Sequence, residues 1–286
     1  MIPTATKAAI GLIFVAFAAI ELWRGGFLNR AQMKQGDVIV DVFSNTVIPM
    51  LVPPVVLFLS HSLANAVMPH TYGMWADWPV WMMVGALLIG DDLLQYAWHR
   101  LSHTSWLYPL HRAHHSAGYM SVRIVYRNNL FYYAMMPSLW VSGLLLYWGF
   151  APVYMFYLVA KMAVIIGAHS SAPWDAPLRR HRLTRPLIWV LERVISTPST
   201  HAAHHGLHSA DGVTHYRGNY GNFLFLWDVL FGTAHITGQR PVAYGIEGLE
   251  PVGWWRELLV PAPVVWTREP KQDAAPIGPD IHTNTR

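Results

Sequence analysis

The chain has no cysteine among its 286 residues, which excludes disulfides, iron–sulfur clusters and thiolate-bound zinc. Charged residues are also scarce: they make up 13% of the chain, against about 25% in soluble domains. The few charges form no long run of lysine or arginine, and no RNA-binding aromatic motif accompanies them. The net charge of +4 is therefore not expected to serve nucleic-acid binding.

Apolar residues dominate the composition instead. Hydrophobic residues account for 53% of the chain, and its mean hydropathy is +0.26. The 14 tryptophans and 13 tyrosines supply amphipathic rings of the kind that gather where a membrane meets water. This composition predicts an integral, multi-pass membrane protein.

Four or five stretches are long and apolar enough to cross a bilayer. The first three are residues 8–23, 42–60 and 78–98. The fourth, residues 130–168, is twice the roughly 20 residues that one crossing needs, so it predicts two helices with a turn near 149–152. The expected fold class is therefore all-α, an integral-membrane helical domain.

The distribution of positive charge predicts which side of the membrane each connection occupies. Alternation through the membrane puts residues 24–37, 99–129 and 169–240 on one side, and these segments hold fourteen lysines and arginines. The opposite side holds only Lys7. Lysine and arginine favour the cytoplasmic side, so the three basic segments are predicted to form a cytoplasmic cap.

No polar linker or internal repeat divides the chain, which predicts a single domain over residues 1–266. Residues 267–286 are polar and lack an apolar pattern, so a disordered tail is expected there. The triplet at 16–18 resembles a signal-peptidase site. Cleavage there would leave the basic residues 24–34 on the wrong side of the membrane, which argues against a cleaved signal.

Histidine is the unusual residue of this sequence, with sixteen copies. Eight of them fall into one HxxxH pair and two HxxHH boxes. Because residues three and four apart share one face of a helix, each box can aim two or three imidazoles at one point. A ninth histidine stands where the last apolar stretch ends. These nine candidate ligands are His99, His103, His111, His114, His115, His169, His201, His204 and His205.

All nine histidines fall on the predicted cytoplasmic side, next to the membrane surface. Such a number overfills a single zinc site and suits two metal ions. Imidazole also binds copper and nickel, so the residues favour a dinuclear site more strongly than they favour iron. The HExxH motif of zinc metalloproteases is absent.

Asp92, Gln95, His99 and His103 recur every three or four residues and form a polar stripe on an otherwise apolar helix. Ionisable groups inside membrane helices are costly and usually functional. Asp92 is therefore predicted to accept the second N–H of a ligand histidine, directly or through water. The alternative is a structural hydrogen bond between helices.

These residues resemble the fatty acid hydroxylase / sterol desaturase superfamily of membrane histidine-box oxygenases. The similarity covers about residues 85–235 and follows the family order of motifs. Only seven residues separate His103 from His111, as in this superfamily and unlike the acyl-CoA desaturases. The motifs are Asp92–His103 (D-x-x-x-Y-x-x-H-R-x-x-H), His111–Ser116, Gly167–Ser170, Thr197–His205, Asn219–Asn222 and Trp227–Thr233.

The resemblance implies two iron ions, O2 as co-substrate and a lipid substrate. It also implies electrons from NAD(P)H, delivered by a separate redox partner of the ferredoxin or cytochrome type. Two features depart from the family pattern. Pro173 stands four residues after His169, where some members have a second histidine, which leaves His181 or His208 as candidates for a tenth ligand. Residues 122–130 lack the family's Arg-x-His-Pro pattern, and we expect them near the substrate entrance.

Hydroxylation of a fatty-acyl, sterol or other lipid is the predicted reaction. Desaturation or C–C cleavage on the same scaffold is an alternative, because both begin with removal of a hydrogen atom. Two other classes remain open. A membrane metal-binding or transport protein would place its site near the midplane, often between inverted repeats. A dinuclear metallohydrolase would usually add carboxylate ligands and a base.

Overall fold

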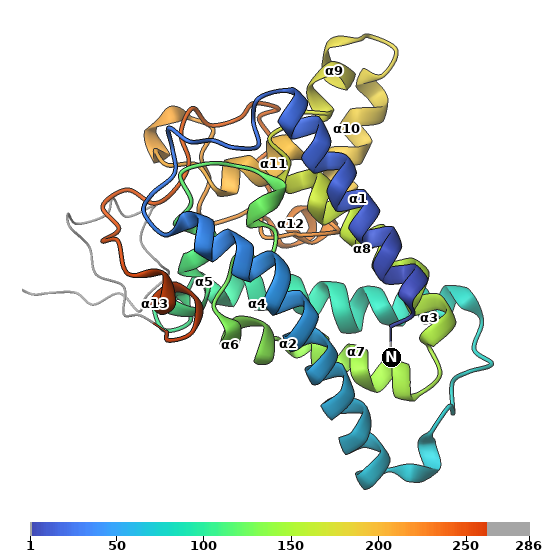
Figure 1. Cartoon of the computed structure of the whole chain (residues 1–286). Helices are drawn as coiled ribbons and strands as arrows, with labels where there is room; N and C mark the ends of the chain where they lie inside the picture. The colour runs from blue at the N-terminus through green and yellow to red at the C-terminus, as the bar shows by residue number, and fades with distance from the viewer. Residues whose placement is uncertain (1, 262–286) are drawn as a thin grey trace, which may run out of the picture.

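The computed structural model describes residues 2–261 of the chain, so the predicted tail at 267–286 lies outside the described residues. Within this described part, every regular element is a helix, and extended backbone pairs only at two isolated bridges. The all-α fold class predicted from the sequence is confirmed. Long helices extend from one end of the molecule, and most of the short ones gather at the other (Figure 1).

Four helices are long and apolar enough to cross a membrane. The helix α1 (Thr4–Trp23) packs on α8 (Ala151–His169). The helix α2 (Asp37–Val67) continues through three prolines, whose freed carbonyls neighbouring helices can satisfy in a membrane. The third crossing is a continuous run from Val80 to Ser102.

This third crossing is α-helical only at its two ends. It consists of α3 (Val80–Leu87), a π-helical segment η2 (Leu88–Leu93) and α4 (Leu94–Ser102). A π-helical turn adds a residue to the helix and is frequent at functional sites. The turn here carries Asp91 and Asp92, both buried.

The expected fourth crossing, the first half of the apolar stretch 130–168, is made by two short helices, α6 (Leu130–Ala134) and α7 (Pro137–Tyr147). The 11 residues of α7 cover only about 16 Å, roughly half of an apolar bilayer core. By length and composition, four helices of the described chain are candidate spans, and the chain returns from the cap to the connection before α8 through the shorter α6 and α7. The predicted turn is present: Gly149 has φ +109°, and a Cβ there would approach Ala76 to 2.8 Å.

Aromatic side chains mark the end of the molecule where α7 stops. The Trp75 ring lies 4.6 Å from that of Trp78 and 4.4 Å from that of Trp148. Backbone hydrogen bonds from Gly73 to Tyr147 and from Trp75 to Trp148 join the two connections at this end. Such a cluster is typical of a membrane–water interface.

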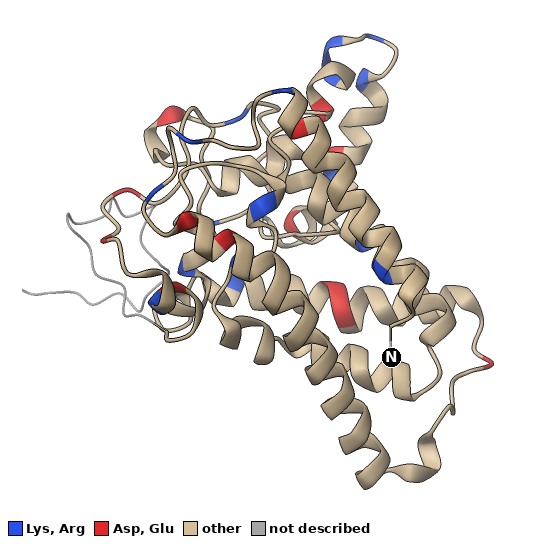
Figure 2. Ribbon diagram, viewed as in Figure 1, with Lys and Arg blue, Asp and Glu red and all other residues tan. Residues whose placement is uncertain are grey.

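The opposite end is a cap of short helices. Lysine and arginine are concentrated there, whereas the long helices carry few charges (Figure 2). Buried charge ties the cap to the spans. Glu21, near the end of α1, accepts hydrogen bonds from the Ser121 and Ser170 hydroxyls and from two backbone N–H groups. Arg127 pairs with Asp37 at 2.6 Å and with Asp41 at 2.9 Å, both at the start of α2.

One charge inside the spans, Lys161 of α8, also finds a partner. Its ammonium group lies 2.5 Å from Asp91, and the Tyr157 hydroxyl donates to the same carboxylate at 2.7 Å. The second carboxylate, Asp92, is 4.0 Å away. The η2 segment therefore presents a compensated ion pair to α8, as a charge in lipid requires.

Candidate metal centre

Four elements carry the nine predicted ligands, and each begins or ends at the cap. His99 lies in α4, and His103 follows its last residue. His169 is the last residue of α8. The two HxxHH boxes lie on short helices of their own, α5 (Tyr108–His115) and α11 (Pro198–His204), with His205 directly after the last residue of α11.

Local sequence signals explain why the two box helices begin where they do. Proline stands in the first turn of both, where its missing N–H costs no hydrogen bond. Thr197 caps α11 by accepting from the Thr200 backbone N–H, and the Thr200 hydroxyl accepts from the Thr197 N–H in return. This capping box fixes the direction in which the imidazoles of α11 leave the backbone.

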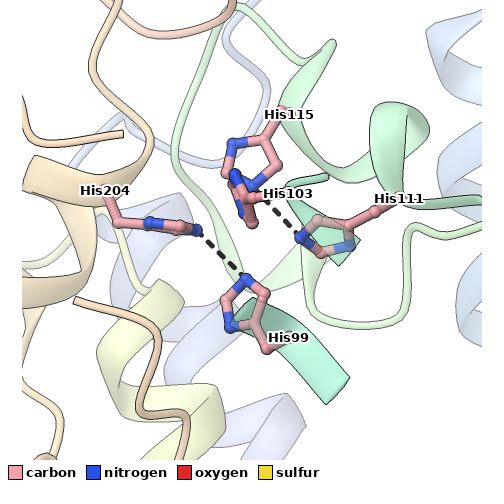
Figure 3. Close-up of side chains that lie close together, drawn as sticks. All are labelled: His99, His103, His111, His115 and His204. Carbon is pink, nitrogen blue, oxygen red and sulfur yellow. Dashed lines mark hydrogen bonds between the residues drawn. The ribbon is translucent and has the colours of Figure 1, made fainter. Parts of the chain in front are cut away.

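The structure brings all nine predicted ligands together, in two groups whose ligand atoms lie within 4.8 Å of one another. Each HxxHH box contributes to both groups, although the spacing alone suggested that one box serves one point. Adjacent residues supply different groups, as His114 and His115 do. The two groups meet where the rings of His115 and His205 stack with their centroids 4.4 Å apart. The larger group is His99, His103, His111, His115 and His204, shown in Figure 3; the smaller is His114, His169, His201 and His205.

All nine imidazoles are buried. Transfer out of water penalises the charged form of a histidine, and neighbouring imidazoles penalise it further. Burial lowers the pKa of the ligands outside the spans, which keeps them neutral and able to bind metal. The lowered pKa values belong to His103, His111, His114, His115, His201, His204 and His205.

Backbone carbonyls set the tautomer of four of the nine imidazole rings. His99 Nδ1 lies 2.7 Å from the Tyr220 carbonyl, and His204 Nδ1 lies 2.7 Å from that of Gly218. His114 and His169 reach the carbonyls of Ile124 and Ile165 in the same way. A carbonyl can only accept, so Nδ1 must donate and Nε2 keeps its lone pair.

The lone pairs fixed in this way face one another. His99 Nε2 and His204 Nε2 are 3.1 Å apart, a contact drawn as a dashed line in Figure 3, and those of His114 and His169 are 3.4 Å apart. With both Nδ1 atoms protonated, a hydrogen bond between such atoms would require an extra proton, which burial of these rings disfavours. A metal cation removes the repulsion instead, so the residues fit metal ions in both groups.

The donor set also restricts the kind of metal. Neither group contains a carboxylate among the residues that the structure describes. Imidazole nitrogen suits zinc, copper, iron and nickel and is a poor choice for magnesium or calcium. Two neighbouring transition-metal ions therefore match this arrangement best.

Among the described residues, Asp92 has no direct hydrogen bond to any of the nine histidines, and the Nδ1 of His99 is used by the Tyr220 carbonyl. Its carboxylate accepts from Trp227 Nε1 at 2.8 Å and from the Leu224 backbone N–H at 3.2 Å. Asp92 therefore anchors the segment that holds the Tyr220 carbonyl. Hydrogen bonds between segments were the alternative predicted for Asp92, and a contact with a ligand histidine through water stays a prediction.

The two candidates for a tenth ligand lie away from the centre. His181 and His208 are both exposed, and neither belongs to either group. His208 lies 3.8 Å from Glu247 at the surface. Gln95 belongs to the polar stripe, and its buried Oε1 has no hydrogen-bond partner among the described residues.

Several supporting residues could not be found from the histidine pattern. Asn128 accepts from His111 Nδ1 at 2.7 Å, so the segment that departs from the family pattern supports two ligands, His111 and His114. Asp228 accepts from the backbone N–H of Tyr220 and Gly221 and so shapes the loop that holds His99. Burial raises the pKa of Asp228 to about 6. The block around Asn219 and Trp227 was the only sequence signal for this loop.

The histidine geometry coincides with a match to a known family. The model of the fatty acid hydroxylase family matches residues 82–233. The chain belongs to this family. The region contains all nine histidines, and it agrees with the 85–235 core inferred from the motifs, so the resemblance seen in the sequence is confirmed.

Two relatives are similar over most of this chain. Ornithine lipid hydroxylase OlsE of Rhizobium tropici is 29% identical over 238 residues, which is 80% of this chain and 63% of that protein. Alkylglycerol monooxygenase of Danio rerio is 25% identical over 206 residues, which is 67% of this chain and 38% of that protein. The matches therefore cover less than two thirds of either relative. No solved structure matches the chain.

Proposed function

We propose that this fatty acid hydroxylase family member is a membrane-bound di-iron monooxygenase that hydroxylates a C–H bond of a lipid with O2. The observation that carries the proposal is the pair of adjacent all-histidine groups, one of five ligands and one of four. Iron held there would supply O2 activation and hydrogen abstraction. The two relatives, named as a hydroxylase and a monooxygenase, support this reaction class.

The chain's own residues would hold and insulate the site. His99 and His204 present Nε2 because the carbonyls of Tyr220 and Gly218 occupy their Nδ1 atoms. Such partners orient a ligand and increase its basicity. Burial of all nine rings excludes bulk water, which protects a strong oxidant from side reactions.

A lipid substrate follows from where the ligands lie. His99 and His103 end the third candidate span, and His169 ends the fourth. A chain held among apolar helices would therefore reach the metal site without entering water. The relatives are named for an ornithine lipid and for alkylglycerol, and a polar lipid is the substrate class that we propose.

Electrons would come from NAD(P)H through a separate protein carrier of the ferredoxin or cytochrome type. The described residues contain no cysteine for an iron–sulfur cluster of their own, and the histidines are committed to the two groups. The basic, cytoplasmic face of the cap is where we expect an acidic carrier to dock.

Two alternative reactions, hydrolysis and desaturation, compare differently with the site. A dinuclear metallohydrolase would be expected to use carboxylate ligands, and neither histidine group has one. Desaturation stays the closest alternative, because it shares the site and the first hydrogen abstraction.

Turnover under isotopically labelled O2, followed by mass spectrometry of extracted lipid, tests the proposal. A hydroxylase places one labelled oxygen atom in its product, and the His204→Ala variant should place none. The exposed His208→Ala is the matched control and should retain activity. An unlabelled product lighter by two hydrogens would replace hydroxylation by desaturation, and the absence of any oxidised lipid would overturn both.

A further inference from the structure

The helix α10 (Arg185–Val194) carries an exposed apolar stripe. Leu187, Val190 and Val194 recur every three or four residues and so lie on one side of the helix, and Leu183 lies in the turn just before it. Their exposed fractions are 77%, 52%, 50% and 38%, whereas Ile188 on another face is 1% exposed. The helix thus packs on the cap through one face and leaves a second apolar face uncovered by the described residues.

The hairpin that carries this stripe is rich in arginine. The hairpin of α9 (Asp175–Arg180) and α10 contains five arginines and two acids. Both acids are buried and paired with Arg179. Among the described residues, no carboxylate pairs with Arg180, Arg182 or Arg185. Trp189 is exposed beside them, with the Arg193 guanidinium 3.9 Å from its ring centre.

The hairpin leaves the molecule at the level where two spans end. It begins six residues after His169, the end of α8. The intervening Ser170 and Ser171 donate to Glu21, near the end of α1. Figure 1 shows α9 and α10 projecting from the body at this end, and Figure 2 shows their basic residues.

Buried side chains fix the α9–α10 hairpin to the cap. Asp175 is fully buried and accepts from the Ser199 backbone N–H at the start of α11. Ile188 and Glu192 are buried on the inner face of α10. The direction of the exposed stripe is therefore fixed by the same framework that holds His201 and His204.

We infer that the α9–α10 hairpin is an interfacial anchor that inserts Leu183, Leu187, Val190 and Val194 into an anionic lipid surface beside the spans. An exposed apolar stripe on a short hairpin that also carries unpaired arginines and an exposed tryptophan has the composition of helices that lie in the headgroup region. Unpaired arginines supply the charge complementarity to anionic lipid. Continuity with α1 and α8 places the stripe where the bilayer surface begins.

Spin labels can test this directly, because the chain contains no cysteine of its own. Leu187→Cys and Val190→Cys are labelled in the full chain and reconstituted into vesicles of phosphatidylcholine and phosphatidylglycerol. Val242→Cys is the matched control: Val242 is a 95% exposed apolar residue of the cap outside the hairpin. Power saturation then compares collisions with O2, which is enriched in lipid, and with a water-soluble nickel chelate.

We expect O2 accessibility to exceed nickel accessibility at 187 and 190, and the reverse at 242. Equal nickel accessibility at all three positions would overturn the inference. Labels at 187 and 190 that are shielded from both agents, in vesicles and in detergent alike, would mean that a protein covers the stripe and would also overturn it.

A second comparison tests the charge requirement. Replacement of Arg180, Arg182 and Arg185 by glutamine should raise nickel accessibility at 187 in the mixed vesicles. The parent chain should show the same shift on transfer to phosphatidylcholine alone. Identical depth in both lipids, with and without the arginines, would contradict recognition of anionic lipid.

Discussion

The ring of His204 contacts both another predicted ligand and the loop that orients it. Its Nε2 faces His99 at 3.1 Å, and its Nδ1 is held by the Gly218 carbonyl at 2.7 Å. Removal of the ring deletes a ligand of the five-histidine group and leaves the four-histidine group complete.

We therefore expect His204→Ala to lower bound metal from two ions per chain towards one and to abolish lipid oxidation. The loss of affinity should exceed the roughly 10–100-fold that follows removal of a supporting partner. Metal analysis of purified protein measures this. His208→Ala, in an exposed histidine, should keep both ions, and a full complement of metal in His204→Ala would refute the ligand assignment.

The buried histidines also determine how the metal-free chain responds to acid. Burial lowers their pKa in the folded state, for example that of His115, whereas the unfolded chain titrates near 6.5. The stability that depends on neutral rings is fully present above about 6.5 and is lost as pH falls from there towards the lowered folded-state values.

After metal removal, the melting temperature should therefore drop as the pH is taken below about 6.5. Each buried ring that stays neutral contributes up to about 1.4 kcal/mol per pH unit. His115→Gln removes one such group and should flatten the profile, whereas the exposed His181→Gln should not. A pH profile that is the same in all three proteins would contradict this origin.

At the scale of elements, the spans and the box helices were predictable because their signals are local. Apolar length gave the four long helices, and histidine spacing gave the faces of α5 and α11. The length of the helix expected before residue 149 was overestimated. The apolar stretch 130–168 does not reveal the break between α6 and α7, which leaves only 11 residues in α7.

The partners of the ligands could not be predicted in the same way. The carbonyls of Gly218 and Tyr220 belong to a loop more than ten residues from any histidine box, and a backbone oxygen leaves no mark in a side-chain pattern. The π-helical turn that directs Asp92 towards Trp227 was also hidden, since it changes the helical register that the sequence argument assumed.

Gly218 offers a test of this loop. A Cβ at Gly218 would overlap the Thr233 carbonyl oxygen and the His215 ring, so alanine must displace the backbone that holds His204. We expect Gly218→Ala to destabilise the protein by roughly 1–3 kcal/mol, as overpacking typically does, and to lower metal content.

Gly85→Ala is the matched control, because nothing lies within 4 Å of a Cβ there and alanine favours a helix. Thermal unfolding and metal analysis compare the two variants. Unchanged metal binding in Gly218→Ala would show that the carbonyl of this loop is not needed to orient His204.

On the scale of the whole molecule, charge and ligands share one end. The connections that precede α2, follow α4 and follow α8 carry the basic residues, whereas residues 68–79 and 148–150 contain neither lysine nor arginine. Sequence alone predicted this separation, and the structure places the two histidine groups at the basic end.

The positive-inside rule then predicts that the metal centre faces the cytoplasm. The chain has no cysteine, so a single introduced cysteine reports on which side of the membrane its position lies. Val242→Cys tests the exposed surface of the cap, and Asp77→Cys tests the exposed connection at the aromatic end. In intact cells, a membrane-impermeant maleimide should label position 77 and leave position 242 unlabelled until the membrane is opened. Labelling of 242 in intact cells would invert the orientation and exclude a cytoplasmic electron carrier, while labelling of both would break the assignment of the four helices as spans.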